Sequence, residues 1–149
     1  MTMNAKTYTL REGDIERQWF VVDATGETLG RLATRVARVL EGKHKPTWSP
    51  NLDGGDHVII LNAKKITVSA AKQSTKLYQR HSGHPQGFKE ETLGKLLERR
   101  PEEVIRLAVK GMLPRNRLAR KQLTKLKVYA GPEHPHAAQK PEKLEITTR

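Results

Sequence analysis

The sequence contains no cysteine, which excludes disulfide bonds, thiolate metal ligands and a cysteine nucleophile. Its longest apolar runs, such as residues 58–61, are far shorter than the roughly 18 residues that a membrane span needs. The first residues lack the apolar stretch that a signal peptide carries. We therefore expect a cytoplasmic protein that does not span a membrane.

Acidic residues are missing from two long stretches. Residues 57–89 hold six Lys/Arg and residues 104–132 hold eight, with no Asp or Glu in either. Residues 1–60 carry eight basic and eight acidic residues, so the whole net charge of +12 lies in residues 61–149. Such a charge points to a polyanionic partner, nucleic acid or an acidic membrane surface. The alternative, a basic face with no partner, is disfavoured because unrelieved like charge lowers folding stability.

Length and composition predict one domain. The chain has 149 residues, of which 36% are hydrophobic, enough for one modest core and too few for two. We expect an N-terminal extension over residues 1–18, a single domain over 19–130, and an extended C-terminal tail over 131–149. The prolines of that tail suggest that a partner mainly holds it in place.

The apolar pattern of the domain begins as strand, helix, strand. Residues 19–24 and 57–61 are short apolar runs typical of buried strands, and apolar residues recur at helical spacing over 28–41. This order predicts a βαβ unit and an at least partly parallel sheet. Further elements are expected as strands over 65–69 and 126–130, an irregular or strand-like segment over 76–82, and helices over 89–99, from residue 101 to Pro114, and over 115–124.

The densest basic segment is residues 110–127, where seven Lys/Arg occur without an acid. Pro114 fixes a corner between two helices there, so the cations sit on a rigid shape. Few side chains suited to reading base edges share one helix face, so shape and backbone recognition of folded RNA fits better than reading of the DNA major groove.

Two other segments combine cations with rings. The loop over residues 42–50 contains Lys43, His44, Lys45 and Trp48, and residues 78–83 contain Tyr78, Arg80, His81 and Ser82. Cations can meet phosphates while a ring stacks on a base. Trp48 can equally close the core beneath its loop, and both interpretations stay open.

Metal binding and nucleotide binding are the alternatives to RNA binding. The histidine pairs 81/84 and 134/136 are poor zinc candidates without cysteine. Asp53 and Asp56 could chelate Mg²⁺, but a glycine-rich turn explains them as well. The Asp23–Gly30 turn matches neither nucleotide-binding fingerprint. We therefore expect no metal, no cofactor, no small-molecule substrate, no membrane partner and no catalysis. A nucleotide-binding enzyme and a free-standing DNA- or mRNA-binding regulator remain the alternatives.

At the level of motifs, the chain resembles the L13 family of large-subunit ribosomal proteins over roughly residues 8–142. The resemblance is carried by residues 19–24 (WFVVDA), 29–33 (LGRLA), 42–45 (GKHK), 62–65 (NAKK), 78–83 (YQRHSG), 109–114 (VKGMLP), 116–118 (NRL), 125–131 (KLKVYAG) and 133–136 (EHPH). The length and short tail are similar to those of bacterial members. Trp48 and Ala119 depart from the tyrosine and glycine common in the family.

The resemblance implies that residues 19–130 form a single α/β rRNA-binding domain. Its fold would be a three-layer α/β/α arrangement around a mainly parallel four-stranded sheet, with basic loops. The resemblance also implies a structural role: binding and compacting 23S ribosomal RNA beside neighbouring large-subunit proteins, early in assembly of the 50S subunit. The predicted RNA-contact set combines basic and ring-bearing residues of these segments with two neutral polar ones. Its members are Lys43, His44, Lys45, Trp48, Lys64, Tyr78, Arg80, His81, Ser82, Lys110, Arg115, Asn116, Arg117, Arg120, Lys121 and Lys125.

Overall fold

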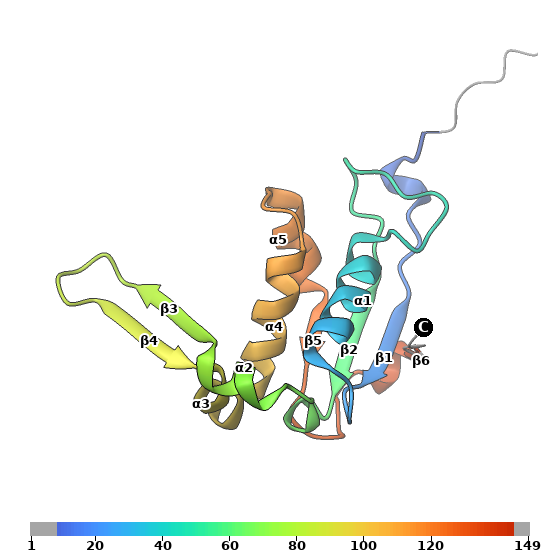
Figure 1. Ribbon diagram of the computed structural model, residues 1–149. Coiled ribbons are helices and arrows are strands. Elements are labelled where there is room, and N and C mark those ends of the chain that lie inside the picture. The colour runs from blue at the N-terminus through green and yellow to red at the C-terminus, as the bar shows by residue number, and fades with distance from the viewer. Residues whose placement is uncertain (1–8, 145–149) are drawn as a thin grey trace, which may run out of the picture.

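The computed structural model describes residues 9–144. A parallel sheet of four strands lies at its centre, in the order β5-β2-β1-β6. The strands are β1 (Trp19–Asp23), β2 (His57–Leu61), β5 (Leu126–Val128) and β6 (Glu142–Lys143). Helices flank this sheet (Figure 1), which confirms the predicted α/β class and its mainly parallel sheet.

The first βαβ unit forms as the sequence predicts. Helix α1 (Leu29–Glu41) joins β1 to β2, and Trp19 pairs with His57 at the start of their register. Gly42 ends the helix with φ +89°, and its N–H donates to the carbonyls of Arg38 and Val39. Only glycine adopts this left-handed conformation without strain. Residues 58–60 of β2 are all fully buried, so both faces of the central strand are covered.

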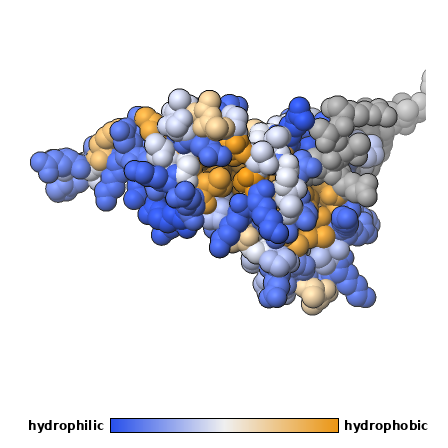
Figure 2. Space-filling view, turned by 60° about the horizontal axis from the view of Figure 1, so that its bottom comes forward, coloured by the Kyte–Doolittle hydropathy of each residue, from blue (hydrophilic) through white to orange (hydrophobic). Residues whose placement is uncertain are grey.

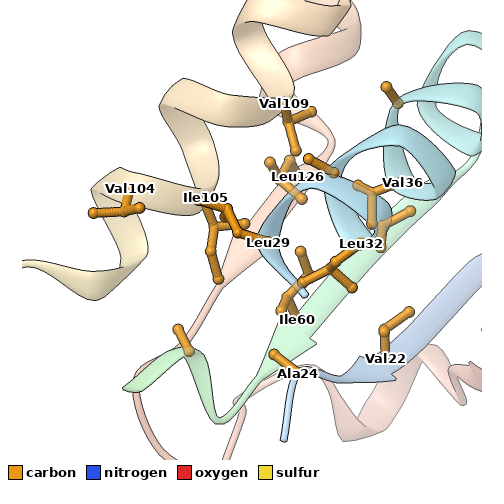
Figure 3. Packing of buried hydrophobic residues seen from close by; sticks show 14 of the residues in the cluster. Val22, Ala24, Leu29, Leu32, Val36, Ile60, Val104, Ile105, Val109 and Leu126 are labelled. Atoms are coloured by element: carbon orange, nitrogen blue, oxygen red, sulfur yellow. The ribbon is translucent and has the colours of Figure 1, made fainter. Parts of the chain in front are cut away.

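The core lies between the sheet and two helices, α1 and α4 (Pro101–Met112). Figure 3 shows Leu32 of α1, Ile105 of α4 and Ile60 of β2 within one packed cluster. Each of these three side chains is fully buried. Burial of this kind stabilises by roughly 1.5–3 kcal/mol for each large aliphatic side chain. Helix α4 is therefore held firmly against the sheet, and so is the corner that follows it.

A two-stranded hairpin projects from this body (Figure 1). Strands β3 (Leu77–His81) and β4 (Phe88–Thr92) pair antiparallel, from Leu77 opposite Thr92 to His81 opposite Phe88. Helices α2 (Ala70–Thr75) and α3 (Leu93–Arg99) lie on either side of the hairpin in sequence. Most of its side chains are exposed, so the hairpin is an arm rather than a part of the core.

Several sequence predictions differ from the structure. The predicted strand over 65–69 is wrong: residues 63–65 form a 3-10 helix, and Thr67 makes only an isolated bridge to Thr28. The predicted helix over 89–99 is wrong at its start, because residues 88–92 form β4 and the helix begins at Leu93. Helix α2 was not predicted. Helix α5 (Arg117–Thr124) and strand β5 confirm the other two elements within a few residues.

The C-terminal tail supplies part of the sheet. After a 3-10 helix over Ala137–Gln139, Glu142 and Lys143 form β6 and pair with Phe20 and Val21 of β1. The expectation that a partner mainly holds the tail is therefore wrong for these two residues, which bind their own sheet. The remaining residues, 145–149, lie outside the described part. Among the described residues, no helix is long and apolar enough to cross a membrane.

Candidate nucleic-acid interface

The corner between α4 and α5 is built by local sequence signals. Helix α4 begins at Pro101 and ends at Met112, and Pro114 cannot continue it. Asn116 then begins α5, because its Oδ1 accepts a hydrogen bond from the N–H of Ala119 (2.8 Å). One side-chain cap and a proline thus fix the angle between the helices.

Cations crowd around this corner. We define the corner surface as the six exposed residues Lys110, Arg115, Asn116, Arg117, Arg120 and Lys121. Within the described residues, none of its five cations has an acidic partner. Unpaired cations on a rigid scaffold are ready to contact phosphates without first breaking an internal ion pair. The structure thus brings together six of the sixteen predicted contacts.

Replacing Asn116 by alanine is expected to destabilise the protein by about 1 kcal/mol, since one N–H of α5 loses its cap. Asn116→Ser keeps a capping oxygen and is expected to retain most of the stability. Urea unfolding followed by circular dichroism measures both. Equal stability of Asn116→Ala and the unsubstituted protein would contradict the capping role.

The loop after α1 uses two of its predicted RNA-contact residues, His44 and Lys45, internally. Asp56 is fully buried, and its carboxylate accepts from Lys45 Nζ (2.6 Å) and lies 2.7 Å from His44 Nε2. Lys45 Nζ also donates to the carbonyl of Glu16 (2.7 Å). Both side chains therefore anchor the loop, and only their partly exposed edges could reach RNA. Asp56 is a counterion here rather than the magnesium ligand considered from sequence.

Lys43 and Trp48 of the same loop face outward. Lys43 pairs with Glu41 (3.1 Å), and its ammonium lies 5.4 Å from the centroid of the Trp48 ring. Trp48 is 37% exposed and lies outside the core cluster. Of the two interpretations left open by the sequence, the structure therefore favours a surface ring. The loop and the corner surface lie at the same end of the molecule, toward the top of Figure 1.

Lys125 is a correction to the predicted contact set. It is only 4% exposed, and its ammonium donates to Asp53 Oδ1 and to the carbonyls of Gly55 (2.9 Å) and Leu40 (3.3 Å). Burial lowers the pKa of Lys125, and the hydrogen bond and charge of Asp53 oppose that shift. An ammonium enclosed in this way is unavailable to phosphate, so we remove Lys125 from the proposed contacts.

The hairpin carries a second, separate group. Arg80, His81 and Ser82 are exposed at its outer half, whereas Tyr78 is half-buried near its base. Burial raises the pKa of Tyr78, and Lys76 Nζ lies 5.2 Å from its ring centroid. Figure 2 shows hydrophilic residues over the outer end of the hairpin. These residues project from the body on one side, apart from the corner surface (Figure 1), and Lys64 is exposed in the 3-10 helix after β2.

A ring cluster that the sequence did not reveal ties the tail to the sheet. Trp19 stacks on His57, with centroids 4.2 Å apart and planes 7° from parallel. His136 lies 5.2 Å from Trp19, and its Nε2 is 2.8 Å from the Tyr129 hydroxyl. The His134/His136 pair considered for zinc thus belongs to this packing. No group of three potential metal ligands occurs among the described residues.

The environment of His57 leads us to expect that the stability of the protein depends on pH. Partial burial, and then the nearby positive charge of Lys125, hold the pKa of His57 below its usual value. A lowered histidine pKa means that the unfolded chain binds the proton first as the pH falls through about 6.5. The free energy of unfolding should therefore be highest above that pH and decrease below it, by at most about 1.4 kcal/mol per pH unit for one proton.

Urea unfolding between pH 7.5 and 5.5 tests this. His57→Phe, which keeps an aromatic ring beside Trp19, should flatten the decrease. His84→Phe, on the exposed hairpin loop, should leave it unchanged. Equal slopes for His57→Phe and the unsubstituted protein would contradict the assignment.

Comparison with known proteins decides the family. A family model described as "Ribosomal protein L13" matches residues 17–135. The chain belongs to the ribosomal protein L13 family. This confirms the resemblance drawn from the motifs, which covers nearly the same residues.

Curated relatives agree over almost the whole chain, and each is named large ribosomal subunit protein uL13. The protein from Symbiobacterium thermophilum is 60% identical over 141 residues, covering 95% of this chain and 99% of its own length. The protein from Synechococcus elongatus is 60% identical over 143 residues, covering 96% of this chain and 95% of its own length. The protein from Aquifex aeolicus is 59% identical over 141 residues, covering 95% of this chain and 98% of its own length. In this member of the L13 family, the corner surface is the strongest candidate for contact with RNA.

Proposed function

We propose that this chain binds 23S ribosomal RNA through the corner surface and compacts it during assembly of the large subunit. Membership of the L13 family makes the chain a structural constituent of that subunit, located in the cytoplasmic ribosome. The observation that carries the proposal is the corner itself, where five exposed cations have no acidic partner among residues 9–144 and where Pro114 and the Asn116 cap set the shape. Neutralising phosphates there lets RNA helices that repel one another pack together.

The other exposed predicted residues extend this contact. Lys43, Trp48 and Lys64, with the hairpin residues Arg80, His81 and Ser82, would reach RNA segments beyond the corner. His44, Lys45 and Tyr78 contribute mainly by holding their own segments in shape. Neighbouring large-subunit proteins are the further partners that this position implies. The role requires no catalysis, because positioned charge alone lowers the cost of bringing RNA helices together.

Sucrose-gradient fractionation of a lysate, with the protein located by mass spectrometry, tests the proposal. We expect it in the large-subunit, ribosome and polysome fractions, and in early precursor particles when assembly is slowed. Recovery only among small free complexes would contradict the proposal and favour the alternative of a free-standing regulator.

A further inference from the structure

A groove lies in the angle of the α4–α5 corner. Its lining combines apolar residues with the cations of the corner surface. The residues are Lys110, Leu113, Pro114, Arg115, Asn116, Ala119, Arg120 and Leu123, and the volume is about 230 Å³. Leu113 and Ala119 are nearly buried and Leu123 is half-buried, so they form an apolar floor. Lys110, Arg115 and Arg120 are exposed around it.

The charge around the groove selects the kind of ligand. Every ionisable side chain that lines it is a cation, and no acidic residue occurs anywhere in residues 104–132. An apolar floor surrounded only by cations suits a ligand with a flat, weakly polar part and flanking negative charges. A nucleotide within an RNA strand has this composition, since its base offers an apolar face and phosphates lie on both sides.

The size of the groove limits how much RNA it can hold. Pockets for drug-sized ligands occupy roughly 300–1,000 Å³, and this groove lies below that range. A base inside a helix is stacked on both faces and cannot enter such a hollow. A base in a bulge or loop can leave the stack and place its face on protein side chains.

Asn116 provides a directed polar contact at the groove. Its Oδ1 is engaged by the N–H of Ala119, so its amide nitrogen, Nδ2, is left with two hydrogens to donate. The described structure gives this nitrogen no acceptor. A donor that is fixed in place by a helix cap loses little entropy on binding a base or sugar oxygen.

We propose that the groove holds one unpaired, unstacked nucleotide of the ribosomal RNA, an inference that rests on the proposed function. Its base lies on the floor formed by Leu113, Ala119 and Leu123. Arg115 and Arg120 bind the adjacent phosphates, and Asn116 Nδ2 donates to the base or ribose. The corner thus recognises a local RNA shape, a splayed-out nucleotide, in addition to the density of phosphates.

Filling the floor while keeping every cation tests this proposal. Ala119→Leu adds bulk on the floor, and Ala71→Leu is the matched control on an exposed helix outside the corner. The full-length proteins are bound to 23S rRNA, and affinity is measured together with chemical probing of unpaired bases and hydroxyl-radical probing of the backbone. Circular dichroism checks that each variant is folded, and Leu123→Gln provides a second change to the floor.

We expect the unsubstituted protein and Ala71→Leu to protect at least one unpaired base. Ala119→Leu should lose this protection and bind about tenfold to a hundredfold more weakly, while protection of the neighbouring backbone remains, because a stacked base contributes about 1–3 kcal/mol. Folded floor variants with unchanged affinity and base protection would overturn the inference and leave the proposed function intact. Absence of 23S rRNA binding by the unsubstituted protein would overturn both.

Discussion

Replacing Arg115, Arg117, Arg120 and Lys121 together by glutamine is expected to weaken binding to 23S rRNA by about 10²–10³-fold at 0.15 M salt. Each phosphate neutralised on RNA contributes about 0.7–0.9 to the slope of log K against log salt. Four lost contacts should therefore reduce the slope by about 3. Filter binding or fluorescence anisotropy across a salt series measures both quantities.

A charge-matched variant separates this site from the overall charge. Arg31, Arg38, Lys95 and Lys143 are exposed cations outside the proposed contacts, and changing all four to glutamine removes the same net charge. We expect this control to lose less than tenfold in affinity. Equal losses in the two variants would mean that general electrostatic attraction, rather than the corner surface, accounts for binding.

Lys125→Met is expected to lower the free energy of unfolding by about 3–5 kcal/mol, the cost of breaking a buried ion pair by removing one partner. The change leaves the carboxylate of Asp53 without its counterion and the carbonyls of Leu40 and Gly55 without their donor. Gly55 lies so close to Leu40 that a Cβ on it would be 1.9 Å from the Leu40 carbonyl oxygen. Both carbonyls thus belong to a closely packed junction between α1 and the residues that precede β2.

The neighbouring lysine provides the control. Lys127 is half-exposed on β5 and has no ion pair among the described residues, so Lys127→Met should change stability by less than about 0.5 kcal/mol. The double change Asp53→Leu with Lys125→Met should recover part of the loss, because no unpaired charge remains. Urea unfolding measures all three. A Lys125→Met protein of normal stability but weakened RNA binding would contradict the buried assignment and return Lys125 to the contact set.

Lys125 also shows where sequence reasoning reaches its limit. It belongs to an acid-free basic segment, and its local pattern is the same as that of the exposed lysines beside it. Its partner, Asp53, is 72 residues away in sequence. Lys45 and Asp56 illustrate the same difficulty, since a lysine in a basic loop can serve RNA or its own fold. Only tertiary structure distinguishes the two uses.

Elements long enough to show a repeating pattern of apolar residues were predictable from the sequence, and short elements were not. The β1–α1–β2 unit follows directly from the spacing of apolar residues, and the corner follows from Pro114. Strand β6 has two residues, too few for any pattern. Strand β4 is mostly polar and mostly exposed, so its residues show no alternation of apolar and polar side chains that would predict a strand. The groove was missed because Leu113 and Leu123 fit the periodicity of core residues equally well.

Protein–RNA crosslinking in purified large subunits, with the crosslinked peptides identified by mass spectrometry, tests the central claim most directly. We predict that peptides containing residues 110–121 crosslink to 23S rRNA, at a nucleotide that is unpaired, and that the buried Lys125 does not. Crosslinks to 23S rRNA confined to other parts of the chain, with residues 110–121 reactive toward solvent, would contradict the account.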